Sequence, residues 1–149
     1  IMKKSNHILI PEFERLIQNG HTVEFTPQGA SMRPFIEGGQ DSVLLQSPKH
    51  LKVGHIVLAK IHEQYVLHRI IKIQHDHIIL QGDGNLRGQE QCTTNNIIGQ
   101  VVRIKGKEGK EKRLTKGKIW RHTPMPIKWL ILKIYRKYIQ LQERFKHEN

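Results

Sequence analysis

The chain has few of the features that mark secreted, membrane-spanning or metal-binding proteins. Cys92 is the single cysteine among 149 residues, so no disulfide within the chain and no cysteine-rich zinc site can form. Uninterrupted apolar runs stop at about four residues, as at 129–132, whereas a transmembrane helix needs about 20. Ser5 and Asn6 follow the basic start where a secretory signal would be apolar. We therefore expect a cytoplasmic location, with at most a peripheral position at a membrane.

Acidic residues are scarce, and the excess of basic residues is unevenly placed. The net charge is +12, with 11 basic and 9 acidic residues in 1–104 but 14 basic and 4 acidic residues in 105–149. We predict a nearly neutral β domain over 1–104 and a basic linker with a helix over 105–149. Such a segment is drawn to phosphate or forms a solvated face. Because 105–118 lacks interleaved aromatic residues, no specific nucleic-acid partner is expected.

Runs of β-branched and aromatic residues between turn signals predict a mainly β fold. Pro11 and Gly20 bracket a short N-terminal helix over 12–19. The Lys- and Gly-rich stretch 105–118 predicts a flexible linker or an exposed hairpin. Turns are expected at 63–64 and 75–76, and strands at 22–26, 42–46, 56–62, 65–73, 77–81 and 97–104.

The tail over 124–147 has the periodicity of an amphipathic helix. Basic residues fall largely on the opposite side, and aromatic residues could anchor the helix at an interface. We expect Trp129, Lys133, Arg136 and Lys137 to face an anionic membrane surface or a partner. The alternative is that the apolar stripe packs on the β body or on a second copy of the chain. The stripe comprises Ile127, Leu130, Ile131, Ile134, Tyr138, Leu141 and Phe145.

Three short segments together suggest nucleophilic catalysis. Residues 29–34 (GASMRP) offer a serine, Ser31, in a Gly/Pro loop, where Gly29 permits close approach of a substrate and Pro34 shapes the turn. A serine needs a base, which His68 in the strand-like segment 65–70 could supply. Asp83, in the turn sequence GDGN, could orient that imidazole. Taken singly, each segment also fits a purely structural role.

In this order, the segments resemble the signal peptidase I family, in particular its endoplasmic-reticulum and archaeal type. The resemblance rests on four boxes, at 29–34, 51–57 (LKVGHIV), 65–70 (YVLHRI) and 82–85, and spans about 26–103. That family is related to the self-cleaving SOS-repressor peptidases. The ordered series is more specific than any single box.

The resemblance implies a coiled β-sheet pseudo-barrel that cleaves extended peptides. It implies Ser31 as the nucleophile, with Gly29, Met32 and Pro34 in the loop that binds substrate and oxyanion. It further implies His68 as the general base and Asp83 as its acidic partner. In the endoplasmic-reticulum type a second acid follows the Gly-Asp box, so Glu90 is an alternative to Asp83.

The sequence also departs from the family pattern. Gly39-Gln40-Asp41 carries an inserted residue, and the N-terminal membrane anchor usual in the family is not seen. A catalytically inactive peptide- or membrane-binding module on the same fold is therefore the alternative function. The stretch before Ser31 is short for a DNA-binding domain with a cleavable linker, which disfavours an autoproteolytic regulator. No cofactor is predicted, and no metal site, because His75 and His77 lack further ligands at suitable spacing.

Overall fold

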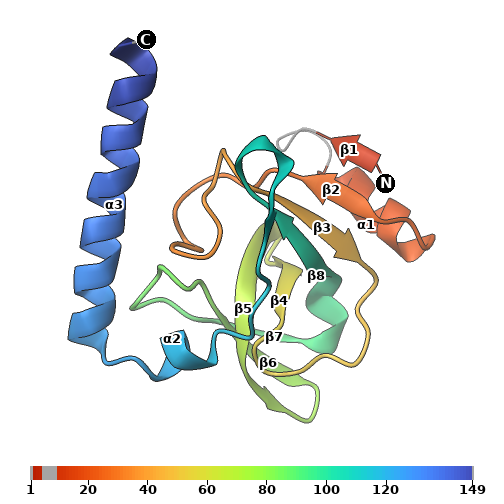
Figure 1. Ribbon diagram of the computed structural model, residues 1–149. Helices are drawn as coiled ribbons and strands as arrows, with labels where there is room; N and C mark the ends of the chain where they lie inside the picture. Colours follow the sequence, from red (N-terminus) through yellow and green to blue (C-terminus); the bar gives the residue numbers. More distant parts are fainter. Residues whose placement is uncertain (1, 5–9, 149) are drawn as a thin grey trace.

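Figure 1 shows a mainly β chain whose sheet curls beside one long helix, in a computed structural model that describes residues 2–4 and 10–148. The helices are α1 (Ile10–Gln18), α2 (Lys118–His122) and α3 (Met125–Glu148). Short 3-10 turns occupy Thr94–Asn96 and Lys107–Gly109. The strands are β1 (Met2–Lys4), β2 (Val23–Phe25), β3 (Ser42–Gln46), β4 (Ile56–Ile61), β5 (Gln64–Gln74), β6 (His77–Gln81), β7 (Glu90–Thr93), β8 (Ile97–Lys105) and β9 (Glu111–Lys112).

The described strands form one sheet in the order β1-β2-β3-β8-β4-β5-β6-β7, with β9 paired to β8. All pairings are antiparallel except that of β1 with β2. The register shifts at Leu44/Leu45, Leu58/Ala59 and Ile70/Lys72. Irregularities of this kind bend strands and increase their twist, which explains how the sheet curls.

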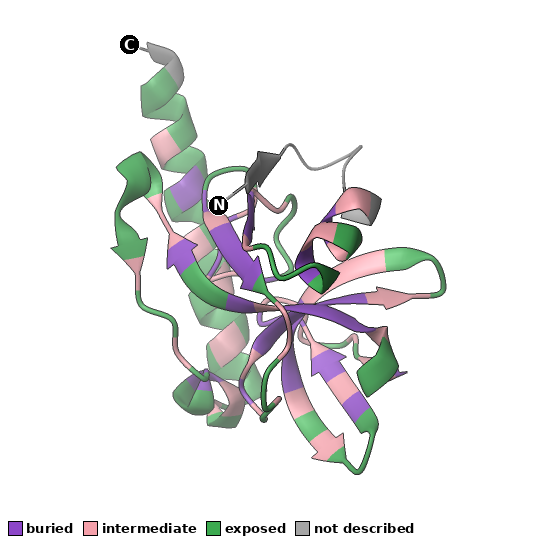
Figure 2. Cartoon of the chain, turned by 90° about the vertical axis from the view of Figure 1, so that its right-hand side faces the viewer, coloured by how far each residue is buried: buried purple, intermediate pink, exposed green. Residues whose placement is uncertain are grey.

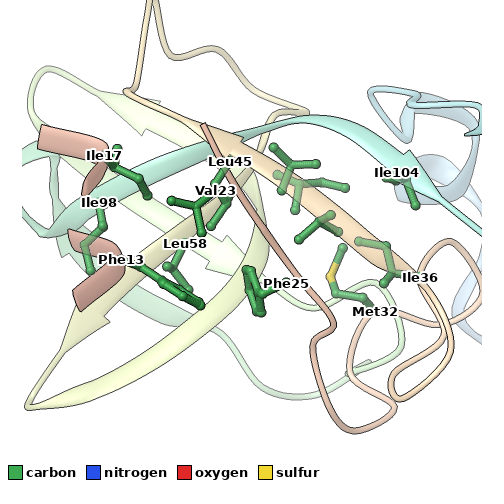
Figure 3. Packing of buried hydrophobic residues seen from close by; sticks show 13 residues of the cluster. Phe13, Ile17, Val23, Phe25, Met32, Ile36, Leu45, Leu58, Ile98 and Ile104 are labelled. Carbon is green, nitrogen blue, oxygen red and sulfur yellow. The ribbon is translucent and has the colours of Figure 1, made fainter. Parts of the chain in front are cut away.

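Two clusters of buried apolar residues form the core, and many of the buried residues lie on the strands of the sheet (Figure 2). In the larger cluster, Phe13 and Ile17 of α1 pack on strand residues such as Leu45 (Figure 3). Met32 and Ile36 reach the same cluster from the loop between β2 and β3. This loop also carries Ser31, so the core itself holds the loop in place.

The structure confirms the predicted strands to within one residue at each end and the predicted C-terminal helix equally closely. The turn between β4 and β5 comes one residue earlier than expected, at His62 and Glu63, whose φ angles of 49° and 63° fit a tight hairpin turn. For 105–118 the sequence predicts either a flexible linker or an exposed hairpin, and the pairing of β8 with β9 confirms the hairpin. Strand β7 escaped prediction because its sequence, EQCT, does not alternate between polar and apolar residues.

Helix α3 turns an unexpected face to the β body. Its least exposed residues are Lys128, Leu132, Tyr135, Ile139 and Gln142, whereas the predicted apolar stripe is exposed throughout, from 39% at Ile131 to 66% at Phe145. The alternative in which this stripe packs on the β body is therefore wrong. None of the helices in the described ranges combines the length and the apolar composition that a membrane crossing needs.

Candidate active site

Ser31 lies at the exposed tip of the loop between β2 and β3. Its neighbour Met32 is buried, and the Ile36 amide donates a hydrogen bond to the Met32 carbonyl oxygen at 3.0 Å. The Gly84 amide donates to the carbonyl oxygen of Ser31 at 2.9 Å. Within the described part of the chain the Ser31 amide itself donates no hydrogen bond, so it is free to bind a developing oxyanion.

The Ser31 loop is closed at its base by two glycines. Gly29 has a φ of +92°, and a Cβ atom on Gly38 would overlap the Gly29 backbone. The Gly39 amide also donates to the Pro27 carbonyl oxygen at 2.7 Å. The close approach of the two limbs explains the glycine at position 38, whereas the positive φ angle explains the glycine at position 29. Around Ser31 the chain turns, because the Arg33 amide donates to the Ala30 carbonyl oxygen at 3.2 Å, and Pro34 directly follows this turn.

His68 and its carboxylate partner come from β5 and from the start of β7. His68 is buried, and its Nδ1 atom forms a short hydrogen bond with Oε1 of Glu90. Because an ionised carboxylate can only accept, Nδ1 carries the hydrogen. The other ring nitrogen, Nε2, is then left as an acceptor. Glu90 therefore fixes the tautomer that a general base requires.

The second edge of the His68 ring faces the Ser31 loop across Gly82. A Cβ atom at Gly82 would lie 3.0 Å from His68 Nε2 and would overlap the Ser31 carbonyl oxygen. Ser31 and His68 also line one pocket of about 280 Å³, whose other walls are largely apolar and include Met32, Leu58 and Tyr65. The structure thus brings the predicted nucleophile and base to one pocket. Gly82, expected only as a turn residue, is the spacer between them.

Asp83 does not hold His68, which corrects the first choice made from the sequence. Both of its carboxylate oxygens accept hydrogen bonds from Arg69, at 2.8 Å from Nε and 2.7 Å from Nη2. Successive side chains on a strand point to opposite faces, so His68 and Arg69 reach different partners. Glu90, the alternative acid, is the carboxylate beside His68.

The Arg69–Asp83 pair is instead a buried junction of the fold. Arg69 has no exposed surface, and its Nη1 also donates to the carbonyl oxygens of Gly54 and Thr115. The indole of Trp120 in α2 donates to the Asp83 carbonyl oxygen at 2.8 Å. This junction was not predicted from the sequence, although Arg69 stands in the same box as His68.

Helix α3 is anchored to the Ser31 loop through charged and aromatic groups. Arg33 donates two hydrogen bonds of 2.8 Å to Glu37, and its guanidinium lies 5.8 Å from the ring centroid of Tyr135. Burial raises the pKa of Tyr135 to about 12, and the nearby Glu37 carboxylate acts in the same direction. This contact fixes the first half of α3 beside the candidate site.

The four residues expected to face a membrane or partner do not share one surface. Trp129, Lys133 and Arg136 line a groove between α3 and the loops of Ser31 and Asp83, whereas Lys137 lies outside it. Among the described residues, no three His, Cys, Asp or Glu side chains converge as metal ligands would. A scan against protein-family models and a search of curated proteins both find no match to this chain.

Removing the charge of Asp83 and removing that of Glu90 should lower stability by very different amounts. Asp83→Asn leaves the buried Arg69 without its counter-charge and should lower the free energy of unfolding by about 3–5 kcal/mol. Glu90→Gln changes a partly exposed side chain and should cost less than about 1 kcal/mol. Urea unfolding followed by tryptophan fluorescence measures both. Equal losses in the two variants would contradict the assignment of Asp83 to the fold and Glu90 to His68.

Proposed function

We propose that the chain is a serine endopeptidase that resembles signal peptidase I, with Ser31 as nucleophile and His68 as general base. The observation that carries the proposal is the position of the His68 ring, with Nδ1 on Glu90 and the opposite edge toward the Ser31 loop. A buried imidazole fixed at one nitrogen and open at the other is the arrangement that serine activation requires.

In this mechanism the Ser31 hydroxyl attacks the scissile carbonyl carbon while its proton passes to His68 Nε2. Glu90 stabilises the resulting imidazolium, and the Ser31 amide donates to the oxyanion. The imidazolium then protonates the leaving amine as the C–N bond breaks, which leaves an acyl-enzyme. Water attacks this ester with His68 again as the base, and the acid product and the free serine are released.

The curled sheet supports a peptidase fold of the signal peptidase and SOS-repressor type. The pocket beside Ser31 suits an apolar side chain of an extended peptide or leader segment, because Met32, Leu58 and Tyr65 form its walls. Substrate recognition would then combine strand-like backbone pairing with one buried side chain.

Ser31→Ala should abolish peptide cleavage with little change in stability, because the Ser31 side chain is exposed. We expect loss of about 10⁴-fold or more in turnover of a proteome-derived peptide library by the purified chain. Ser42→Ala, at a half-buried serine outside the site, is the matched control. Comparative peptidomics of cells carrying either variant reports on natural substrates. Unchanged peptides with Ser31→Ala would favour the inactive binding module instead.

A second proposal concerns the partner surface on α3. We infer that the exposed apolar stripe docks on an anionic membrane, whether or not the chain is catalytic. The stripe offers large side chains such as Leu130, Ile134 and Phe145, and Lys137 and Arg144 lie along one flank. The net charge of +12 opposes stacking of two copies and attracts anionic lipid.

Co-sedimentation with vesicles of phosphatidylcholine and phosphatidylglycerol tests this docking. Binding should exceed that to pure phosphatidylcholine, fall as salt rises, and be lost in the double variant Leu130→Ser and Ile134→Ser. The matched control is Val102→Ser with Leu114→Ser, two exposed apolar residues outside α3. Equal binding by both double variants, or no binding at low salt, would refute the docking.

A further inference from the structure

A groove of about 690 Å³ runs between the first half of α3 and the two loops that carry Ser31 and Asp83. In Figure 1 both loops extend from the sheet toward the helix. Ala30, which precedes Ser31, and Gly84, which follows Asp83, both line the groove. The side chains that shape it are Arg33, Arg87, Trp129, Leu132, Lys133 and Arg136, and we call it the basic groove.

The basic groove carries uncompensated positive charge. Among the residues that the structure describes, no Asp or Glu lines it. Arg33 is neutralised by its two hydrogen bonds to Glu37. Arg87, Lys133 and Arg136 have no carboxylate within ion-pair distance among the described residues. Three cations are therefore available to a ligand, in a concave site where their fields add.

The groove also has apolar surface that suits a peptide. Trp129 and Leu132 line the groove together with the cations, and the Lys133 ammonium lies 4.9 Å from the Trp129 ring centroid. A ligand would thus meet apolar contact and positive charge together. Free phosphate or a bare polyanion would use the charge alone, which favours an acidic peptide as the occupant.

Around Ser31, residues that line the apolar pocket alternate along the chain with residues that line the basic groove. Gly29, Ser31 and His68 line the pocket, whereas Ala30 and Arg33 line the groove. An extended chain advances about 3.3 Å per residue, so a peptide crossing Ser31 reaches the groove within a few residues.

We propose that the basic groove binds an acidic segment of the peptide substrate, a few residues from the bond that is cleaved. The proposal rests on the proposed peptidase function and adds its substrate class: peptides with Asp or Glu on the α3 side of the cleavage site. Residues advance by 100° around a helix, which puts Arg136 nearly opposite Ile134 of the apolar stripe. A chain docked through that stripe would therefore leave the groove open.

Binding to the Ser31→Ala chain tests the groove without requiring catalysis. The probe is a fluorescein-labelled, C-terminally amidated octaglutamate, followed by fluorescence anisotropy at low salt. The groove variant Arg87→Gln, Lys133→Gln and Arg136→Gln should bind it about tenfold more weakly. The matched control, Lys110→Gln, Arg113→Gln and Lys118→Gln, removes the same number of charges from exposed positions outside the groove and outside α3, and should retain affinity within about twofold.

Two further probes, octaglutamine and an oligonucleotide, distinguish the chemical class of the ligand. Octaglutamine with a free C-terminal carboxylate distinguishes capture of a peptide terminus from capture of acidic side chains, and tighter binding of it than of octaglutamate would overturn the proposal. Equal losses in the two triple variants, or preference for an eight-nucleotide oligothymidine, would overturn it as well. A third outcome separates the groove from the peptidase function. If the Ser31→Ala chain binds octaglutamate selectively but the chain with Ser31 cleaves no peptide, the peptidase function is rejected and the acidic-peptide groove stands.

Discussion

A buried ion pair between Arg69 and Asp83 holds together the parts from which the site is made. A guanidinium with no exposed surface must be paired, because an unpaired charge in the interior is strongly destabilising. Pairing fixes Asp83, and with it the adjoining Gly82, against β5. Gly82 in turn sits between the Ser31 carbonyl oxygen and the His68 ring. The geometry of the reactive groups thus depends on a pair that touches neither of them.

Helix α3 is constrained as well, because one of its faces packs on the body, one is apolar and exposed, and one faces the candidate site. Tyr135 and Ile139 pack toward the body, where Tyr135 meets Arg33 of the Ser31 loop. The apolar stripe around Ile134 faces away from the body and is exposed. Trp129 and Arg136 face the loops of the candidate site. Part of the basic charge that sets the tail apart in the sequence therefore lies in a groove beside Ser31, and part lies on the flank of an exposed apolar face.

Most of the strands, the long helix and the meeting of Ser31 with His68 in one pocket could be predicted from the sequence. Strand alternation and turn chemistry are local, so β3 and β6 match their predicted bounds. The acidic partner of His68 and the packed face of α3 could not be predicted. The choice between Asp83 and Glu90 depends on which side of β5 each carboxylate approaches, and only the folded sheet decides this. The same holds for α3, whose packed face follows contacts with Arg33 rather than its own hydrophobic pattern.

Activation of Ser31 depends most directly on the tautomer of the His68 imidazole. Nitrogen-15 chemical shifts of His68, recorded at a pH where the ring is neutral, report which ring nitrogen carries the hydrogen. With Glu90 as the fixed acceptor, Nδ1 should be protonated and Nε2 unprotonated, and Glu90→Gln should perturb the Nδ1 signal. A ring protonated at Nε2, or an Nδ1 signal indifferent to Glu90→Gln, would contradict the proposed role of His68 as the base for Ser31.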